Sequence, residues 1–336
     1  MVVDIATRVI DETEDVFIIQ PGHRYWLYET FREQSVVFLD FPRLPLSFAS
    51  PPPTDLMLRR MVVRSMHHAD WIDGNRGGPE PAWDLEAYAG KDFRKRLGRY
   101  VGAIKRLYWN MPSGSIVVVP GPHYYDDVLI GEVQDEPFMF SNPRIYDGEE
   151  IPARKVRWLR GKARSSFRVD VRDRFGKPNP ITILDRSLRK DILRAGYDQY
   201  AFDDEFTARF DTSEEQFTTL DDYEIQQFVN YVGGVLVALD AGCTHELTLD
   251  EAIQFLRNNR EAAIDLKLQI SSPGFQRLLD ETVKPLVVAA LLTAALAGHG
   301  ASASPTGGMA NSVEIVNAGR RDDDQCTVKV KERVIS

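Results

Sequence analysis

Short runs of β-branched and aromatic residues, each ended by proline or glycine, constrain the fold of this chain more than any other feature. Ser113-Gly114 leads into Ile116–Val119, and Pro120-Gly121-Pro122 ends that run. Such a run between turn residues favours a short buried strand. Four further runs follow at similar spacing: Val128–Val133, Glu136–Phe140, Ala153–Leu159 and Phe167–Val171. Five or more short strands at this spacing predict a small β-barrel.

Residues 1–200 also contain two earlier strand patterns and several helix patterns. Val16–Ile19 and Ser35–Phe41 are apolar runs that Pro21-Gly22 and Pro42 end, so both are expected to be buried strands. Helices are expected at three places: after the capping residue Thr54, over Lys91–Asn110 with a basic outer face, and from Pro180 to Leu193. We therefore expect one α+β domain over residues 1–200, a small β-barrel with flanking helices.

The pattern changes after residue 200. Residues 201–215 are acidic and polar, and we expect them to be a linker. Residues 216–336 are expected to form a second, mainly helical α+β domain. Its predicted elements are helices over Asp221–Asp240 and Thr248–Arg260, a strand over Ala263–Ile270, and a hairpin of Ser312–Val316 with Cys326–Val330. The 14 uncharged residues Pro285–Gly298 fall short of the roughly 20 that span a bilayer, so they predict a buried helix.

Charge is strongly segregated along the chain. The net charge is −9, but residues 1–90 carry −6, residues 91–200 carry +8 and residues 201–336 carry −11. A positive middle segment between negative flanks is typical of a module that meets an anion. The overall acidity therefore does not exclude nucleic acid as a partner.

The cysteines and the N-terminus indicate the compartment. Cys243 and Cys326 are far apart and have no metal-ligand spacing, so neither a disulfide framework nor a zinc site is indicated. The first residues lack the basic start and continuous apolar run of a secretory signal. We therefore expect a cytoplasmic protein that has no membrane span and needs no metal or cofactor.

Five motifs follow one another between residues 15 and 200. They are Val16-Phe17-Ile18-Ile19-Gln20-Pro21-Gly22 with Tyr25-Trp26, Val36-Val37-Phe38-Leu39-Asp40-Phe41, Met111-Pro112-Ser113-Gly114-Ser115-Ile116-Val117-Val118-Val119-Pro120, Val128-Leu129-Ile130-Gly131-Glu132-Val133, and Ala153-Arg154-Lys155-Val156-Arg157-Trp158-Leu159. In this order they resemble the EVE and YTH-like branch of the PUA superfamily, and the last two motifs are the most specific. The resemblance implies a PUA-like small β-barrel. The chain departs from the family in a long insertion between Pro42 and Gly90 and in the acidic Asp126-Asp127.

The resemblance also implies a function. In such families the barrel holds a flipped or modified base between aromatic walls. Carried over by position, the ligand-binding residues here are Tyr25, Trp26, Trp109, Phe138 and Trp158, and ordinary core packing is the alternative for each tryptophan. The resemblance further implies a restriction or phage-defence setting, in which an effector protein or further copies of the chain are partners.

A basic run follows the most specific motif. Between Arg154 and Lys177, ten of 24 residues are cations, and only Asp170 and Asp173 are acids. Charge of one sign favours contacts with the phosphates of nucleic acid, whereas a solvated face is the alternative. The phosphate-binding residues expected from this run are Arg154, Arg157, Arg160, Lys162, Arg164 and Arg168.

No residue pattern typical of catalysis stands out. The histidines His67-His68 and His123 lie outside any serine or cysteine motif, and there is no P-loop or dinucleotide fingerprint. The leading hypothesis is a non-enzymatic sensor of nucleic acid or a modified nucleobase, whose C-terminal domain transmits the signal or oligomerises. The alternatives are a nuclease or hydrolase that uses Glu246, Asp250 and Glu251, and a structural self-assembling protein.

Overall fold

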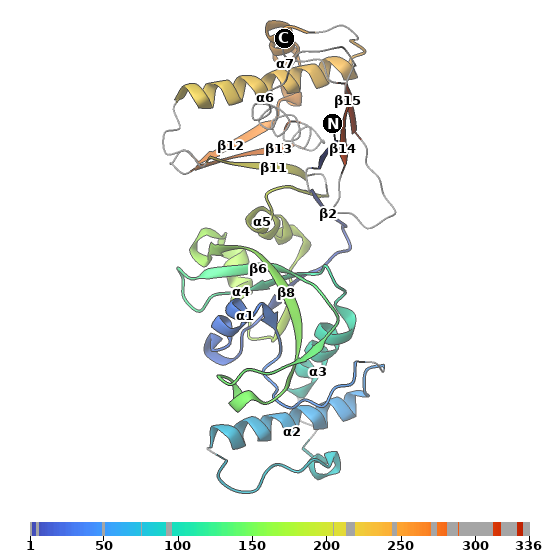
Figure 1. Ribbon diagram of the computed structural model, residues 1–336, viewed down its shortest axis with the longest axis vertical. Coiled ribbons are helices and arrows are strands. Elements are labelled where there is room, and N and C mark those ends of the chain that lie inside the picture. Colours follow the sequence, from blue (N-terminus) through green and yellow to red (C-terminus); the bar gives the residue numbers. More distant parts are fainter. Residues whose placement is uncertain are drawn as a thin grey trace, which may run out of the picture. The chain divides into compact units, whose positions relative to one another are not determined.

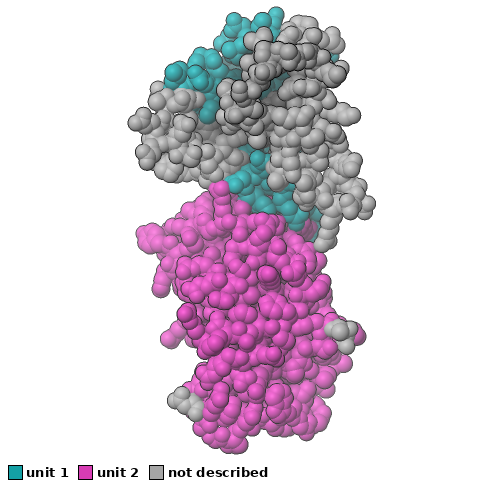
Figure 2. All heavy atoms as spheres, viewed as in Figure 1, with its two compact units in different colours: residues 1–13, 197–336 teal, residues 14–196 magenta. Residues whose placement is uncertain are grey.

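The computed structural model divides the chain into two units, which the main chain connects twice (Figures 1 and 2). Unit 1 comprises residues 1–13 and 197–336, and unit 2 comprises residues 14–196. The structure describes residues 2–4, 7–48, 51–74, 76–91, 96–203, 205–212, 219–243, 247–269, 274–280, 288, 312–316 and 328–331. The first 13 residues, expected in the N-terminal domain, thus belong with the C-terminal half of the chain.

Unit 2 is built on a curled, mixed sheet that forms a half-barrel with helices around it (Figure 1). Its strands are β3 (Val16–Ile19), β4 (Val36–Val37), β5 (Ile116–Val119), β6 (Asp127–Val133), β7 (Phe138–Phe140), β8 (Ile151–Ala163) and β9 (Ile181–Ile183). They are ordered β4-β8-β6-β5-β3-β9, and β7 also pairs with β8. Only β3 and β5 run parallel to each other, and the other pairs are antiparallel. The strands expected over Ile116–Val119, Val128–Val133 and Ala153–Leu159 are confirmed.

The described helices of unit 2 are α1 (Tyr28–Gln34), α2 (Asp55–Asp73), α3 (Leu97–Lys105), α4 (Val169–Phe175) and α5 (Arg186–Gly196). Thr54 caps α2 as expected, because its hydroxyl accepts a hydrogen bond from the Met57 amide at 3.3 Å. The strand expected over Phe167–Val171 is wrong. Helix α4 begins there instead, and it buries Val171 and Phe175, which lie four residues apart on one helical face.

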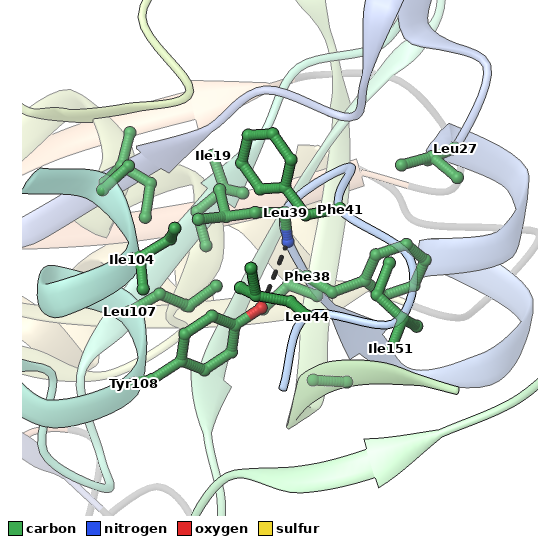
Figure 3. Close-up of a cluster of buried hydrophobic side chains, with 14 of the residues drawn as sticks. Ile19, Leu27, Phe38, Leu39, Phe41, Leu44, Ile104, Leu107, Tyr108 and Ile151 are labelled. Atoms are coloured by element: carbon green, nitrogen blue, oxygen red, sulfur yellow. Dashed lines mark hydrogen bonds between the residues drawn. The ribbon is translucent and has the colours of Figure 1, made fainter. Parts of the chain in front are cut away.

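The core of unit 2 is tied together by a buried tyrosine (Figure 3). Tyr108 lies on the helical turn Arg106–Asn110 that continues α3. Its hydroxyl donates to the Pro152 carbonyl at 2.7 Å and accepts from the Leu39 amide at 3.4 Å. Burial raises the pKa of Tyr108 well above its usual value, so the hydroxyl keeps its proton. One neutral group therefore links three distant segments of the chain.

An irregularity divides β8 where it pairs with β6. The register shifts between Ile130 and Gly131, and Gly131 lies opposite Trp158. A Cβ atom on Gly131 would lie 2.6 Å from Cε3 of Trp158, closer than atoms can approach. The glycine of the Ile-Gly-Glu motif is therefore required by close packing against the tryptophan ring.

Unit 1 contains two sheets and two helices among its described residues. Its elements are β1 (Val2–Asp4), β2 (Arg8–Ile10), β10 (Tyr200–Phe202), β11 (Glu205–Thr212), β12 (Asp265–Gln269), β13 (Gly274–Asp280), β14 (Ser312–Val316), β15 (Val328–Lys331), α6 (Thr219–Asp240) and α7 (Leu249–Asn258). One sheet has the order β12-β13-β11-β10-β2 and the other β1-β14-β15. The helices expected over Asp221–Asp240 and Thr248–Arg260 are confirmed, as are the strand within Ala263–Ile270 and the terminal hairpin.

Two expected segments of unit 1 are not found as expected among the described residues. The linker expected over residues 201–215 is wrong, because β10 and β11 pair with each other and β11 also pairs with β13. The helix expected over Pro285–Gly298 lies outside the described residues except for Val288, which is buried against Val229, Val232 and Leu278. In the described part of the chain, no helix has the length and apolar character that crossing a bilayer requires.

Candidate functional site

The turn that follows β3 has an unusual backbone and carries two aromatic residues. Gly22, Arg24 and Tyr25 have φ angles of 73°, 54° and 63°. Left-handed backbone is rare for residues other than glycine, and it persists where the surrounding structure holds it. A Cβ atom on Gly22 would lie 2.6 Å from Nε1 of Trp26, so only glycine fits there. The turn thus fixes the consecutive residues Tyr25 and Trp26, each with its own neighbours.

Tyr25 lies beside Arg164, which follows the end of β8. The guanidinium carbon of Arg164 is 6.0 Å from the centre of the Tyr25 ring. The guanidinium donates to the Tyr25 hydroxyl at 3.3 Å and to the Gly121 carbonyl at 3.2 Å. Gly121 belongs to the loop between β5 and β6, and the Arg164 amide donates to the Asp126 carbonyl of this loop at 2.9 Å. Arg164 therefore joins the turn after β3 to the β5–β6 loop.

The β5–β6 loop presents two exposed tyrosines. The exposed fractions are 52% for Tyr124 and 80% for Tyr125, and the two rings meet edge to face with centres 5.1 Å apart. Arg172 of α4 donates to the Tyr124 hydroxyl at 2.7 Å and to the Ser165 carbonyl at 3.2 Å. Its guanidinium carbon is 5.3 Å from the centre of the Tyr124 ring. An arginine thus orients one of two aromatic rings that face solvent.

Among the described residues, Arg164 and Arg172 donate only to neutral oxygen atoms, which belong to tyrosine hydroxyls and backbone carbonyls. Within the described residues neither guanidinium forms an ion pair, whereas Arg168 and Arg174 both pair with aspartates. The positive charges of Arg164 and Arg172 are therefore not neutralised by a carboxylate in the part of the chain that the structure describes. Lys162 adds a further cation nearby, with its amino nitrogen 5.5 Å from the Phe167 ring centre. We use the name Tyr–Arg surface for Tyr25, Tyr124, Tyr125, Arg164 and Arg172.

Trp26 makes a different set of contacts. Its indole is 44% exposed, and Nε1 donates to Oδ2 of Asp40 at 3.0 Å. Tyr146 donates from its hydroxyl to Oδ1 of the same carboxylate, and the Trp26 and Tyr146 rings meet at 89° with centres 5.4 Å apart. Burial, together with the negative charge of Asp40, raises the pKa of Tyr146 far above its usual value. Asp40 thus holds an exposed indole in one orientation, and we name these three residues the Trp26 cluster.

Two of the expected ligand-binding aromatics lie elsewhere. Trp109 packs beside Phe48, with ring centres 6.3 Å apart, on the turn that continues α3. Phe138 lies on β7 and is 36% exposed, and its ring meets that of Phe140 edge to face at 6.4 Å. Each therefore has neighbours different from those of Tyr25 and Trp26.

Trp158, the fifth expected aromatic, is partly buried against the core. Its Nε1 donates to the Phe31 carbonyl at 3.0 Å, and its ring lies against Gly131. These contacts give Trp158 a packing role, the alternative that the sequence left open. The described contacts therefore do not gather the five expected aromatics into a single cage. Of the five, only Tyr25 and Trp26 are neighbours, because they are consecutive in the chain.

Arg154, expected to bind phosphate, is buried, with only 1% of its surface exposed. Its guanidinium donates to the carbonyls of Leu107, Met111 and Asp135 at 3.1, 2.8 and 3.0 Å. Burial lowers its pKa, although arginine keeps its charge. The phosphate contact expected for Arg154 is therefore wrong, because the side chain is buried and its Nε and Nη1 donate to backbone carbonyls in the interior.

Of the other expected phosphate ligands, two pair with carboxylates. Arg157 pairs with Glu132, and Arg168 pairs with Asp170 at 2.6 Å, so their charges are locally compensated. Arg160 is partly buried, whereas Lys162 is exposed near the end of β8. Arg164 belongs to the Tyr–Arg surface described above.

The sequence did not identify five residues of these two sites: Tyr124, Tyr125, Arg172, Asp40 and Tyr146. One signal was present, because two adjacent tyrosines follow Pro120-Gly121-Pro122 in a segment that the strand pattern already marked as a loop. Large aromatics in a loop are candidates for exposed binding residues. The pairing of Asp40 with Tyr146 joins positions 106 residues apart, and no local pattern indicates it.

The acidic residues considered for hydrolysis have structural positions. Glu251 forms a capping box with Thr248 at the start of α7, and Asp250 lies in the same first turn, where acidic side chains stabilise a helix. Glu246 lies outside the described residues. In the part of the chain that the structure describes, no three metal-ligating side chains gather into a possible ion site.

Comparison of the chain with protein-family models, curated proteins and solved structures gives no match. Its function must therefore be inferred from the Tyr–Arg surface and the Trp26 cluster.

Proposed function

We propose that unit 2 is a non-enzymatic module that binds nucleic acid through the Tyr–Arg surface and reads an unpaired base at the Trp26 cluster. The observation that carries this proposal is the pair Arg164 and Arg172, each held against neutral oxygens beside a tyrosine ring. A guanidinium without a carboxylate partner retains its charge for a phosphate, which it binds through two parallel N–H groups. Phosphate contacts supply most of the sequence-independent affinity for nucleic acid.

The exposed tyrosines provide the second component of the interaction. The rings of Tyr124 and Tyr125 are more than half exposed, so a base can stack on them without a rearrangement of the core. Because Arg172 already fixes the Tyr124 hydroxyl, little side-chain freedom is lost when a ligand binds. Stacking combined with phosphate contact favours single-stranded or locally opened nucleic acid over an intact duplex.

The Trp26 cluster is suited to inspection of a base. The exposed indole offers a stacking face, and each carboxylate oxygen of Asp40 has accepted one hydrogen bond and can accept another. A carboxylate accepts hydrogen bonds from the exocyclic amino group of a base. Tyr25 and Trp26 are consecutive, with Cα atoms about 3.8 Å apart, and in this proposal one short oligonucleotide contacts both sites.

The resemblance to EVE and YTH-like domains adds the expected ligand class, a modified base. The curled mixed sheet of unit 2 supports a PUA-like barrel in this proposal. Unit 1 then transmits the binding event to an effector protein or joins copies of the chain in a cytoplasmic restriction or phage-defence system.

Fluorescence anisotropy tests the proposal with labelled single-stranded and duplex oligonucleotides that carry plain or modified bases. Tyr124→Ala/Tyr125→Ala should weaken single-strand binding by about 1–3 kcal/mol for each stacked base. Tyr223→Ala, which removes an exposed tyrosine of α6 in unit 1, is the matched control and should change little. Trp26→Ala should remove the preference for the modified base and leave the salt-dependent affinity intact. Failure of the parent protein to bind any oligonucleotide at low salt would sink the proposal.

A further inference from the structure

A second candidate binding site, made of different residues, lies on helix α2. Arg64 and His68 are both fully buried, and they lie one turn apart on the same face of the helix. The adjacent Ser65 donates from its hydroxyl to the Pro42 carbonyl at 2.6 Å, which holds the helix against the start of the long insertion. Neither Arg64 nor His68 has a role in the Tyr–Arg surface or in the Trp26 cluster.

Arg64 uses only part of its hydrogen-bonding capacity. Its Nη1 donates to the Arg43 carbonyl at 3.0 Å, whereas Nε and Nη2 have no hydrogen-bond partner among the described residues. These two N–H groups share one edge of the planar guanidinium, the edge that binds two oxygens of one oxyanion side by side. The nearby carboxylates of Glu80 and Glu149 pair with Arg43 instead.

His68 is similarly unsatisfied. Neither of its ring nitrogens has a hydrogen-bond partner in the described part of the chain, and Oε1 of Glu149, at 3.9 Å from Nε2, is beyond hydrogen-bonding distance. Burial and the charge of Arg43 lower the pKa of His68, so the imidazole is neutral and offers one donor and one acceptor. Buried polar atoms without partners are rare in folded proteins, and each invites an explanation.

Arg64 lies beneath an exposed aromatic side chain. The Trp83 ring lies over the guanidinium, with its centre 3.8 Å from the guanidinium carbon, and the side chain is 60% exposed. A ligand that displaces this exposed ring gains access to the guanidinium.

We propose that Arg64 and His68 form a binding site for a small oxyanion beneath Trp83, and that phosphate or a phosphate monoester is its ligand. Two oxygens of a phosphate can accept from the Nε and Nη2 edge of Arg64, and a third can accept from the donor nitrogen of His68. A carboxylate group has only two oxygens, and the Arg64 edge uses both.

The test titrates the full chain with inorganic phosphate and monitors the NMR chemical shift of the Trp83 indole N–H. This signal is assigned by its loss in Trp83→Phe. Acetate and chloride at equal ionic strength are parallel titrations. We expect a saturable shift with phosphate, a weaker one with acetate and none with chloride. No shift with phosphate in the millimolar range, or an equal shift with chloride, overturns the proposal. Saturation by acetate as tight as that by phosphate retains the oxyanion site but assigns it to carboxylates.

A pair of variants adds a second readout. Arg64→Lys keeps the positive charge but removes the two-pronged edge, and we expect it to weaken phosphate binding by about tenfold or more. Arg60→Lys lies one turn earlier on α2, where Arg60 pairs with Glu86, and it is the control that should bind phosphate like the parent. Unchanged affinity in a folded Arg64→Lys protein contradicts the proposal. If that variant does not fold, the titration of the parent chain still decides.

Discussion

The two ends of strand β8 carry arginines from one basic run and use them in opposite ways. Near its start, Arg154 is buried and donates to three backbone carbonyls. Beyond its end, Arg164 and the nearby Arg172 of α4 lie against tyrosine rings and have no carboxylate partner among the described residues. Positive charge in a sequence therefore does not distinguish an arginine that stabilises the fold from one that is free to bind a ligand.

The strand pairing also differs between the two ends. At the start of β8, Ile151–Ala153 pair with β7, Arg154 and Lys155 pair with β4, and Val156–Trp158 pair with β6. The last part, from Arg160 to Ala163, pairs with β6 alone. The irregularity at Gly131 and Trp158 separates these parts. Predictions that alter one part and leave the other intact test whether the two ends are independent.

The largest expected effect is at the buried end. Arg154→Met keeps the length of the side chain but leaves the carbonyls of Leu107, Met111 and Asp135 without their donor. An unsatisfied buried group costs about 1–3 kcal/mol, so we expect the free energy of unfolding to fall by about 3–5 kcal/mol. Urea denaturation measures this change. Arg168→Met, which removes an exposed ion pair, should cost no more than about 1 kcal/mol. Equal losses in the two variants would contradict the distinction.

An intermediate effect is expected at the irregularity between the two ends. In Gly131→Ala the new methyl group would lie 2.6 Å from atoms of Trp158 and Val156, so the strands must shift. Such overpacking costs about 1–3 kcal/mol. Gly102→Ala is the control, because a Cβ on this residue of α3 meets nothing within 4 Å, and helix propensity favours alanine. A Gly131→Ala protein as stable as the parent in thermal and urea unfolding would show that this close approach is not required.

The smallest effect is expected at the start of β6, opposite the end of β8. The Tyr28 hydroxyl donates to the Asp127 carbonyl at 2.7 Å, so Tyr28→Phe should lower the free energy of unfolding by about 0.5–1.5 kcal/mol. Burial and the neighbouring Asp127 raise the pKa of Tyr28 to about 12. The contribution of Tyr28 to the free energy of unfolding is therefore fully present below about pH 10 and is lost as the pH rises toward 12. Urea unfolding across this interval should show that the free energy of unfolding falls less steeply with pH in Tyr28→Phe than in the parent. Identical slopes in the two proteins would count against the assignment.

The strands of unit 2 could be predicted because their signals are local. Ile116–Val119 and Val128–Val133 are apolar runs between turn residues, and both are strands in the structure. The failures depend on distant contacts. Residues 201–215 look like a linker because they are acidic, yet β11 pairs with residues 274–280, about 70 positions later. Propensity over a short window carries no information about such a partner.

The candidate site was predictable only in part for the same reason. Tyr25, Trp26 and Arg164 were identified, the first two from the family resemblance and the third from charge density. Arg154 was assigned wrongly because two of its carbonyl partners, Leu107 and Met111, lie more than 40 residues earlier in the chain. Which arginines of a basic run are buried depends on strand register and on the segments that cover the strand, and neither can be read from composition.

The most direct test of the central claim is the salt dependence of single-strand binding in Arg164→Ala/Arg172→Ala. The control is Arg32→Ala/Arg144→Ala, which removes the same charge from two exposed arginines that have carboxylate neighbours. Each lost phosphate contact lowers the slope of log affinity against log salt by about 0.7 for a single strand, so the first variant should lose about 1.4 units and the control none. Arg164→Ala/Arg172→Ala also removes hydrogen bonds to Tyr25, Gly121, Tyr124 and Ser165, so urea unfolding must show that both variants are folded under the binding conditions. A slope unchanged in Arg164→Ala/Arg172→Ala, or reduced equally in the control, would contradict the assignment of the Tyr–Arg surface to phosphate binding.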